Sequence, residues 1–497
     1  MSKWGRVNVG FVSLLVAVVG GSGLAACGSD DDSGGGKAGS AGAGQGGAHA
    51  GSAGAGSGGV AQAGEAGSGE AGTNAAGDSP GGTGGSDGGM GGEAGAPPWH
   101  PPAALQALSP LPALPLDPTN QYADNADAAV LGQRLFFDKR YSGPLKVAGE
   151  LGVIGDTGKV ACATCHLGGA MSDQREPFTV TLGTDLHTRN APALVNSSFY
   201  EWTNWAGRFA AQWELPLAVA ENVRTMNSTR LTLAHFIYDN YKAPYEALFG
   251  ALPAALDANA ADAARFPAAG KPGDAAWDTA MTGNDKTEVN RIIVNFGKAI
   301  QAYLRKLVSR NAPFDQYVAT GGGNLSESAI RGAGLFAGKA KCSLCHSGPF
   351  FSDNKFHNLG NLLPLDDGRF ADAAALKASA LNIDGVFSDK QDTGRLAALS
   401  SPMTDQTTRS AFRTSSLREV KDTAPYMHAG QLATLEAVVS FYNLGGGDVP
   451  ASSPAGTTKD PLMTPLGLSD TEQADLVAFL KTLSGDPVPS TLQAPLP

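Results

Sequence analysis

Two copies of one short cysteine motif constrain this chain more than any other feature. Residues 162–166 read C-A-T-C-H, and residues 342–346 read C-S-L-C-H. Two thiols three residues apart can reach the two vinyl groups of one haem, and the imidazole that follows can coordinate the haem iron. A single copy is also typical of a redox dithiol. Two copies, which use four of the five cysteines, indicate two covalently bound haem c groups.

A zinc site is the alternative use of these residues. The two cysteine pairs would then have to converge on one metal ion, and the histidine after each pair would have no role. The sequence therefore predicts a haem at both motifs. The residues predicted to attach and coordinate the haems are Cys162, Cys165, His166, Cys342, Cys345 and His346.

The fifth cysteine, Cys27, ends a pattern that resembles a bacterial lipoprotein signal. A short positive region with Lys3 and Arg6 precedes an apolar stretch over residues 11–19 and the small-residue site L-A-A-C. This pattern implies that residues 1–26 are removed and that Cys27 is lipidated. An uncleaved membrane helix is the alternative, but the apolar run is shorter than the roughly 20 residues that a bilayer span needs.

Residues 27–98 are predicted to form a disordered tether. The segment 28–98 holds 28 of the 66 glycines of the chain, without a Gly-X-Y period and with almost no large apolar residues. A flexible chain of this length reaches roughly 45 Å, enough to hold a folded body clear of a membrane. Gly28, rather than an aspartate, follows Cys27. By the enteric sorting rule this favours the outer membrane of the bacterial cell envelope, on its periplasmic or surface side.

The charge of the chain argues against one class of partner. The formal net charge is −11, and no cluster of Lys and Arg occurs along the sequence. Binding to phosphates requires a concentrated basic patch, so we expect no nucleic-acid partner. The roughly 400 residues after the tether are enough for two or three lobes and a large buried core, as an enzyme requires.

The folded part reads as mainly α-helical with long irregular loops. Strand-like alternation is limited to short pieces such as residues 178–182, and the proline-rich stretch 99–118 is typical of an extended arm on the surface. Apolar spacing and capping residues predict the helices. These are 124–137, 289–308, 325–336 with Ser326 as its cap, and two helices near the C-terminus that begin after Thr434 and Ser469.

A loose internal repeat accompanies the two motifs. A Leu-Phe pair at the end of a predicted helix precedes each of them, at residues 135–136 and 335–336. The repeat predicts two cytochrome c-like haem lobes. The predicted division of the chain is a signal peptide (1–26), a tether (27–98), a proline-rich arm (99–122), an N-terminal haem domain (123–320), a C-terminal haem domain (321–485) and a tail (486–497).

Further motifs occur in a fixed order between residues 123 and 483. They are LGQRLFFDKR, CATCH, TRNAPALVN, NWAGR, NAPFDQY, LFAGKAKCSLCHSGPFFSDNKFHNLG, DTGR, FRTSSLREVKDTAPYMHAGQLATLEAVVSFYN and ADLVAFLKTL. Their order and spacing resemble those of the bacterial di-haem cytochrome c peroxidases and their MauG-type relatives. The resemblance implies that the haem on His166 is the peroxide-binding site and that electrons enter through the haem on His346.

The resemblance also implies residues between the two haems. Trp205 lies fifteen residues after Asn190, as the tryptophan that lies between the haems does in the family, so it would carry electrons or holes. A packed core tryptophan is the alternative. The positions that hold a calcium ion in the family match Asn190, Thr423 and Pro425, which would bind it through oxygen donors.

The sixth ligand of the second haem separates two branches of the family. It is a methionine in the peroxidases and a tyrosine in MauG-type enzymes, fourteen residues after the histidine of the PYMH motif. Here that residue is Tyr442, counted from His428. A phenolate would stabilise ferric iron and lower the reduction potential. A packed core tyrosine, with Met427 or Met403 as the ligand, is the alternative.

The peroxide side departs from the family pattern. The family places a catalytic glutamate twenty residues after the tryptophan, and Thr225 occupies that position here. Cleavage of the O–O bond needs a group that takes up and returns a proton, so a nearby carboxylate is expected. We expect Glu221 in this role, with Glu214 and Gln212 nearer to the WAGR motif. His187 is either a distal ligand of the first haem or a cap of its own loop.

These observations predict a lipid-anchored di-haem peroxidase. It would reduce hydrogen peroxide to water with electrons from a small cytochrome c or cupredoxin, and store two oxidising equivalents across the irons and Trp205. One alternative is a MauG-like enzyme that oxidises Trp or Tyr side chains of a partner protein, which Tyr442 favours. The other is an electron-transfer protein with both irons six-coordinate. The resemblance also allows a homodimer.

Overall fold

The computed structural model describes residues 99–497 apart from 176–178, 361–367, 393 and 396–407. Trp99–Pro497 clusters as one compact unit. The predicted signal peptide, the lipidation site at Cys27 and the tether over 27–98 lie outside the described residues, as does Met403.

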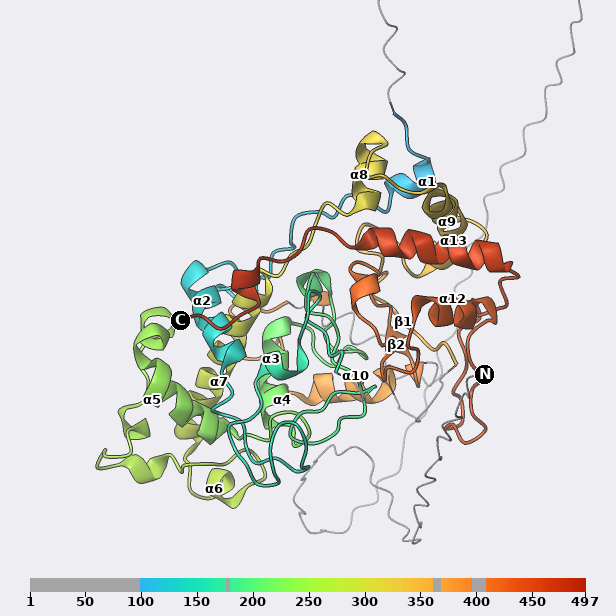
Figure 1. The fold of residues 1–497 in the computed structure, drawn as a ribbon. Helices are drawn as coiled ribbons and strands as arrows, with labels where there is room; N and C mark the ends of the chain where they lie inside the picture. The colour runs from blue at the N-terminus through green and yellow to red at the C-terminus, as the bar shows by residue number, and fades with distance from the viewer. Residues whose placement is uncertain (1–98, 176–178, 361–367, 393, 396–407) are drawn as a thin grey trace, which may run out of the picture. The chain divides into compact units, whose positions relative to one another are not determined.

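Helices carry the fold (Figure 1), which confirms the predicted mainly α class. Where the chain is described, one antiparallel pair of two-residue strands occurs, β1 (Phe356–His357) and β2 (Phe412–Arg413). The α-helices are α1 (Ala103–Gln106), α2 (Ala126–Phe137), α3 (Cys162–Cys165), α4 (Leu215–Glu221), α5 (Arg230–Phe249), α6 (Ala275–Asp278), α7 (Gly283–Leu304), α8 (Pro313–Thr320), α9 (Glu327–Ala337), α10 (Arg369–Ala378), α12 (Leu435–Asn443) and α13 (Asp470–Leu480). The 3-10 helices are Ser197–Phe199, Gln212–Glu214, Ala254–Leu256, Ala263–Arg265, Cys342–Leu344, Val420–Asp422, Lys481–Leu483 and Ser490–Leu492.

Three predicted helix starts are confirmed at their capping residues. The Ser326 hydroxyl accepts from the backbone N–H of Ala329 at the start of α9, and Thr434 and Ser469 cap α12 and α13 in the same way. Such caps satisfy backbone donors that have no partner within the helix. The local spacing was therefore sufficient to place these helices.

Two other local predictions need correction. Helix α7 starts at Gly283 instead of residue 289, because the Thr282 side chain caps it by accepting from Asp285, and it ends at Leu304. The strand expected over 178–182 does not form over the described residues 179–182. This loop folds back on itself, with an isolated bridge between Leu182 and Leu186.

The two largest hydrophobic cores of the described residues organise the fold. The first includes Phe136 of α2 and Phe296 of α7, and the second includes Phe314 of α8, Phe336 of α9 and Phe479 of α13. We call the region from α2 to α7 the first lobe, and α8, α9, α12 and α13 with the loops between them the second lobe. Helix α8, which the predicted division placed in the N-terminal haem domain, packs in the second core. The predicted domain boundaries stay predictions.

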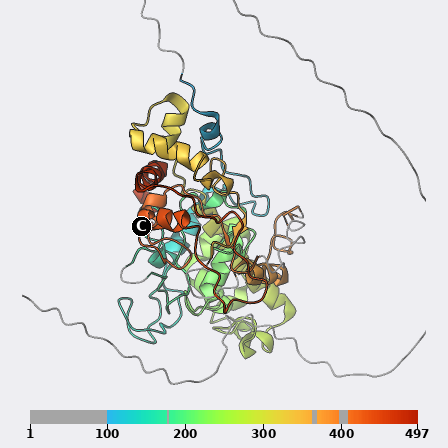
Figure 2. The same cartoon turned by 90° about the vertical axis from the view of Figure 1, so that its right-hand side faces the viewer.

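The proline-rich arm differs from the extended surface segment that we expected. It contains a one-turn helix, α1, and Leu105 and Leu108 are buried in the second core. Figures 1 and 2 both show α1 next to α8 and α9. Burial of these two leucines outweighs the preference of the neighbouring prolines for an extended chain.

Both lobes repeat the same local geometry. Helix α2 packs on α7 in the first lobe, and α9 packs on α13 in the second. Positive φ angles recur at a constant separation of 223 residues, at Asn196 (61°) and Glu419 (61°) and at Gly207 (67°) and Gly430 (62°). The same separation relates two isolated bridges, Thr203 with Phe209 and Tyr426 with Leu432.

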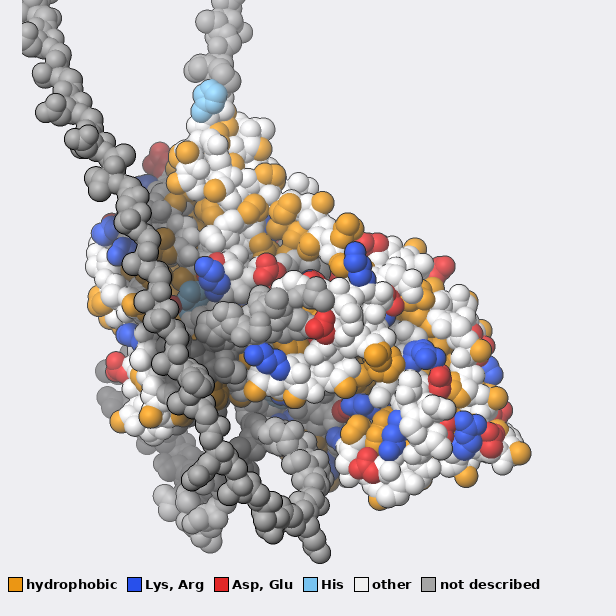
Figure 3. Space-filling view, turned by 180° about the vertical axis from the view of Figure 1, so that it is seen from behind, with side chains coloured by type: hydrophobic (Ala, Val, Ile, Leu, Met, Phe, Trp, Pro, Cys, Tyr) orange, Lys and Arg blue, Asp and Glu red, His pale blue; other side chains and the backbone are white. Residues whose placement is uncertain are grey.

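The C-terminal tail returns to the first lobe. The Gln133 side chain of α2 donates to the backbone oxygens of Thr491 and Ala494, and Val488 is buried in the first core. No helix among the described residues is both long and apolar enough to cross a membrane. Figure 3 shows Lys and Arg interspersed with Asp and Glu on one face of the molecule.

Candidate haem sites and the contact between the lobes

The first cysteine motif forms a single helical turn. Cys162 and Cys165 lie at the two ends of α3, and His166 follows. The Nδ1 atom of His166 lies 3.1 Å from the backbone oxygen of Met171. A proton on Nδ1 makes this contact a hydrogen bond and leaves the lone pair of Nε2 available for a metal. Burial lowers the pKa of His166, which favours the neutral ring that a metal requires.

The second motif repeats this arrangement. Cys342 begins a 3-10 turn, and the Nδ1 atom of His346 lies 3.1 Å from the backbone oxygen of Phe351. Burial also lowers the pKa of His346. Met171 and Phe351 are each five residues after their histidine, and both have a φ of 54°. The two motifs therefore orient their imidazoles by the same local device.

None of the four cysteines of the motifs forms a disulfide, so their sulfurs are available for attachment to haem. Burial raises the pKa of Cys162 to about 11 and that of Cys342 to about 12. Cys345 also lies within 4.8 Å of the ligand atoms of Asp353 and His357, a grouping that could hold a metal ion. A thioether bond to haem would use its sulfur, so this grouping is not a separate metal site.

His357 lies between two carboxylates beside the second motif. Its Nδ1 is 2.6 Å from Asp460 and its Nε2 is 3.1 Å from Asp353. The hydrogen bond to Asp353 is the main cause that raises the pKa of His357 to about 11, and the contact with Cys345 adds to it. His357 therefore joins two distant loops at the edge of the second site through Asp353 and Asp460.

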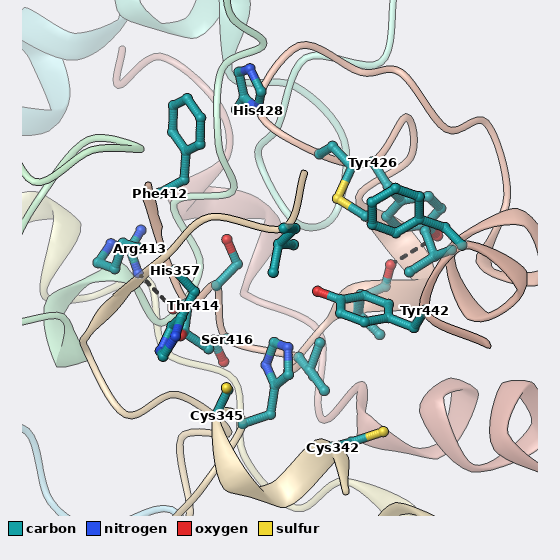
Figure 4. A pocket seen from close by; sticks show the side chains of 18 of the residues that line it. Cys342, Cys345, His357, Phe412, Arg413, Thr414, Ser416, Tyr426, His428 and Tyr442 are labelled. Carbon is teal, nitrogen blue, oxygen red and sulfur yellow. Dashed lines mark hydrogen bonds between the residues drawn. The ribbon is translucent and has the colours of Figure 1, made fainter. Parts of the chain in front are cut away.

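A cavity of about 300 Å³ lies against the second motif (Figure 4). Its lining is largely apolar and aromatic, as is usual for a cofactor pocket. Both cysteines of the motif, its imidazole and a phenol face one space, which is a donor set that fits haem c. The lining includes Cys342, Cys345, His346, Tyr442, Met427, His428, Arg413, Asn190, Trp205, Thr423 and Pro425.

Tyr442 points into this cavity from α12. Its phenol oxygen makes no hydrogen bond with the described residues, and burial raises its pKa well above the usual value. Met427, an alternative ligand, lines the same cavity with a positive φ of 70°. The structure thus brings both described candidates for the sixth ligand to the second motif.

Trp205 lies at the contact between the two lobes. Within the first lobe, its indole N–H donates to the backbone oxygen of Asn190 at 2.6 Å. Two backbone hydrogen bonds join the lobes. The backbone N–H of Asn190 donates to His428, and that of Arg413 donates to Trp205, each at 2.8 Å. Asn190 and Arg413 are 223 residues apart, as are Trp205 and His428. The contact therefore has an approximate twofold relationship between the lobes.

The three residues matched to a calcium site, Asn190, Thr423 and Pro425, all line the cavity at the second motif. The side-chain oxygen of Asn190 is buried and has no hydrogen-bond partner among the described residues. A buried amide oxygen without a partner is costly unless a cation or water binds it. The Asn190 oxygen is thus a suitable donor for a cation.

Comparison with known proteins identifies the family of this chain. A family model for di-haem cytochrome c peroxidase matches residues 126–322. The cytochrome-c peroxidase IdrP1 of Denitromonas iodatirespirans is 33% identical over 403 residues, which cover 77% of this chain and 87% of that protein. The chain belongs to the di-haem cytochrome c peroxidase family. As a member, it carries two haem c groups and is an oxidoreductase that uses peroxide.

Two further similarities extend the comparison. The methylamine utilization protein MauG of Methylorubrum extorquens is 29% identical over 369 residues, covering 74% of this chain and 80% of that protein. The diheme peroxidase BthA from Burkholderia thailandensis E264 superposes with a TM-score of 0.53 at 21% identity, covering 76% of this chain and 92% of the other. The latter similarity concerns the fold alone.

The carboxylate expected at the peroxide side of this di-haem peroxidase lies at the end of α4. Glu221 forms an ion pair with Arg230 at 3.0 Å, and Arg230 also donates to Asn290. Glu221 does not line the cavity at the second motif, as expected for a residue of the first lobe. Thr225, which has the family's position, donates its hydroxyl to the backbone oxygen of Val219.

Glu214, the nearer alternative, is buried at the start of α4. One carboxyl oxygen accepts from the backbone N–H of Ala211 at 3.1 Å, and the other has no hydrogen-bond partner among the described residues. Burial raises the pKa of Glu214 to about 8. The third candidate, Gln212, hydrogen-bonds to Ser197 and Ser198.

His187 caps its own loop in this structure. Its Nδ1 accepts from the backbone N–H of Arg189 at 3.0 Å, and its backbone N–H donates to Thr181. In the neutral ring that accepts this hydrogen bond, the proton is on Nε2. The arrangement matches the capping alternative that the sequence left open.

Sequence reasoning missed two residues at the lobe contact. His428 stacks on Phe412 with ring centroids 3.9 Å apart, and Arg413 is buried in the cavity wall. A signal was present, because the fifteen-residue spacing from Asn190 to Trp205 recurs from Arg413 to His428. Reading this spacing as part of the internal repeat would have identified both residues.

Proposed function

We propose that this protein reduces hydrogen peroxide to two water molecules, with two protons and two electrons from a small cytochrome c or cupredoxin. The observation that carries the proposal is the cavity at the second motif. It brings Cys342, Cys345 and His346 together with Trp205 at the contact between the lobes. An electron that enters at the second motif would therefore arrive in the cavity that Trp205 lines.

The two motifs hold the cofactors in this proposal. Cys162 and Cys165 attach one haem and His166 coordinates it, while Cys342, Cys345 and His346 hold the other. When bound, the haems supply one-electron redox chemistry and an iron site for peroxide. The backbone oxygens of Met171 and Phe351 accept from Nδ1 of each imidazole, which would leave Nε2 to coordinate the iron.

Trp205 acts as the bridge between the two sites. Its indole N–H donates to Asn190 of its own lobe, and its backbone oxygen accepts from Arg413 of the second lobe, so the ring is held in one orientation. The partly buried ring lies between the loop of Asn190 and the second cavity. A fixed aromatic ring shortens the gap that an electron has to cross.

Glu221 is the proposed proton-transfer residue at the peroxide side. The Arg230 guanidinium keeps its carboxylate in place at the end of α4. A carboxylate held in this way can accept a proton from one peroxide oxygen and return it to the other. His187 is assigned to capping its loop, with ligation of the first haem as the alternative.

Calcium would bind at the lobe contact through Asn190, Thr423 and Pro425. The unpartnered Asn190 oxygen supports this assignment. A divalent cation there would neutralise negative charge between the sites and hold the two lobes at a fixed separation. Dimerisation is a further expectation that the family resemblance allows.

A MauG-like oxidation of Trp or Tyr side chains in a partner protein is the second candidate function. The position of Tyr442 in the cavity favours it, because a phenolate ligand stabilises oxidised iron. The similarity to the MauG protein of Methylorubrum extorquens supports it as well. Both functions use the same residues. The electrons come from a small redox protein in the first and from Trp or Tyr side chains of a partner protein in the second.

Export to the cell envelope on a lipid anchor at Cys27 completes the proposal. It rests on the N-terminal sequence pattern, with residues 27–98 as the tether and the outer membrane as the destination. The Cys27→Ser variant should move the protein from the membrane fraction to the soluble fraction. Retention of the variant in the membrane fraction would contradict the anchor.

One experiment tests the function itself. The purified holoenzyme is examined by low-temperature EPR with and without peroxide, before and after partial reduction, and then assayed with reduced cytochrome c. Rapid turnover with cytochrome c supports the peroxidase. Slow turnover together with oxidation of protein side chains favours the MauG-like function. If the EPR spectra show only low-spin ferric haem and no peroxide is consumed, both enzymatic functions are overturned. The protein would then be an electron-transfer protein.

A further inference from the structure

Arg413 is a buried cation in the wall of the second cavity. The residue is 5% exposed, and its Nε atom has no hydrogen-bond partner among the described residues. Its guanidinium carbon lies 3.2 Å from the centroid of the Tyr200 ring. Nη1 makes a long contact of 3.5 Å with the backbone oxygen of Thr414. These contacts leave most of the guanidinium without a strong acceptor.

The other buried arginines have a carboxylate nearby. Arg305 pairs with Asp124 at 2.9 Å, and Arg418 pairs with Asp315 at 2.8 Å through two parallel hydrogen bonds. Arg369 is influenced by the charge of Asp372. Arg413 has no carboxylate partner among the described residues, and Tyr200 is the one group that offers it electrostatic support.

A buried guanidinium without an anion is energetically costly. Arginine stays charged in proteins, and removing its charge from water costs several kcal/mol unless an opposite charge compensates. The fork of guanidinium N–H groups matches the two oxygens of a carboxylate. No described residue supplies this carboxylate, so the environment of Arg413 suits a carboxylate of a ligand bound in the cavity.

The cavity shows where such a carboxylate would come from. It is lined by Arg413 and also by Cys342, Cys345 and His346. Figure 4 shows Arg413 and Thr414 on the opposite side of the cavity from Tyr442. Haem carries two propionate carboxylates, and a haem tied to the two cysteines would fill the space between these groups.

We propose that Arg413 binds a propionate carboxylate of the haem attached to Cys342 and Cys345. The inference rests on the proposed attachment of a haem at the second motif. Arg413 is then a positioning residue, since its backbone N–H also holds the carbonyl oxygen of Trp205. One residue thus contacts both the second cofactor and the bridge to the first lobe.

The pairing has an electrostatic consequence. A cation beside the propionate offsets negative charge near the iron and favours the ferrous state. Removing the cation while keeping the propionate should lower the reduction potential of the second haem. The substitution Arg413→Lys keeps the charge but loses the two-pronged geometry, so it should have a smaller effect.

The test uses the holoenzyme and compares Arg413→Gln, Arg413→Lys and a control, Arg305→Gln. Arg305 is an equally buried arginine that lies outside the cavity. Spectroelectrochemical titration gives the potential of the second haem. Resonance Raman spectra give its propionate bending band. Pyridine haemochrome absorbance gives the number of haems attached per chain.

In Arg413→Gln we expect about a tenfold higher ratio of ferric to ferrous second haem at a fixed poise, equivalent to 59 mV for one electron. The propionate band should shift in the same variant. Arg413→Lys should give a smaller shift of the potential. Arg305→Gln should leave both readouts unchanged even where it lowers the melting temperature.

Three results would overturn the inference. The first is a fully loaded Arg413→Gln protein with the wild-type potential and propionate band. The second is a wild-type propionate band identical to that of a haem c peptide in water, which decides the matter even if no variant folds. The third is a wild-type protein without haem on Cys342 and Cys345, which overturns the proposed function at the same time.

Discussion

The indole N–H of Trp205 donates to the backbone oxygen of Asn190 at 2.6 Å, beside a side-chain amide oxygen of Asn190 that has no partner among the described residues. The proposed electron bridge and the proposed calcium site therefore share one residue. A substitution at the bridge should therefore alter calcium binding, and a substitution at the calcium site should alter electron transfer through Trp205. The contact lies where the backbones of the two lobes exchange hydrogen bonds.

Replacing Trp205 by phenylalanine should slow electron transfer between the two sites several-fold. The variant keeps an aromatic ring but removes the N–H, so the carbonyl of Asn190 loses its donor and the free energy of unfolding falls by about 1–2 kcal/mol. Stopped-flow reduction of the second haem, followed by peroxide addition, measures the rate. Trp202→Phe is the control, because Trp202 is buried next to Arg369 outside the cavity. Equal rates in wild type and Trp205→Phe would exclude Trp205 as the bridge.

Replacing Tyr442 by phenylalanine should alter the low-spin ferric spectrum and raise the potential of the second haem. The reason is the loss of a phenolate ligand that stabilises ferric iron. EPR and a redox titration measure the two effects. Tyr426→Phe is a matched control in the same cavity wall, since the Tyr426 hydroxyl donates to the backbone oxygen of Val420. An unchanged spectrum in Tyr442→Phe would point to Met427 or Met403 instead.

Replacing Asn190 by alanine should weaken calcium binding by about tenfold or more, the size of effect that loss of a supporting group has at other metal sites. Isothermal titration of chelator-treated holoenzyme with calcium measures the affinity. Asn222→Ala, an exposed asparagine of the first lobe, should bind calcium like the wild type. If the wild type itself takes up no calcium, the assignment of Asn190, Thr423 and Pro425 is wrong.

The substitution Glu221→Gln should slow peroxide cleavage by roughly 10²-fold to 10⁴-fold, the usual contribution of a positioned proton-transfer group. Rapid mixing of the partly reduced enzyme with peroxide measures this step. Arg230→Gln separates two causes, because it breaks the ion pair and keeps the carboxylate. Should both variants slow the step equally, the ion pair rather than proton transfer by Glu221 would be responsible. Wild-type kinetics in Glu221→Gln would move the role to Glu214.

The buried carboxyl of Glu214 should make stability fall as the pH rises. Its pKa is raised to about 8 by burial, so the folded state binds a proton that the unfolded state has already lost. Between the ordinary glutamate pKa and about pH 8, the free energy of unfolding should fall by up to about 1.4 kcal/mol per pH unit. Glu214→Gln should remove this slope in urea titrations at several pH values. A slope that persists in the variant would assign it to another group.

Sequence spacing predicted what is decided within a few residues. The caps at Ser326, Thr434 and Ser469 were predictable because a cap hydrogen bond spans three residues. The orientation of each haem-binding imidazole also depends on a carbonyl five residues away. The start of α7 was missed, because its cap at Thr282 precedes the apolar pattern that marks the helix.

The proline-rich arm illustrates a different limit. Its prolines favour an extended chain, but Leu105 and Leu108 are buried in a core that is built mainly from residues more than two hundred positions later. The composition of the arm itself therefore does not predict that these two leucines are buried. The burial of Glu214 was missed for the same reason, since its surroundings come from distant loops.

The sequence by itself determined the chemistry of this protein: two haem-binding motifs, the family that they resemble, and the helices that flank them. The tertiary structure alone decided which side chains meet around the second motif. It brought Asn190 to His428 and Trp205 to Arg413, and it buried Arg413 without a carboxylate partner among the described residues. The physical reason is that covalent attachment and helix capping depend on neighbours in the chain. Burial, cavities and charge pairing depend on residues that only folding brings together.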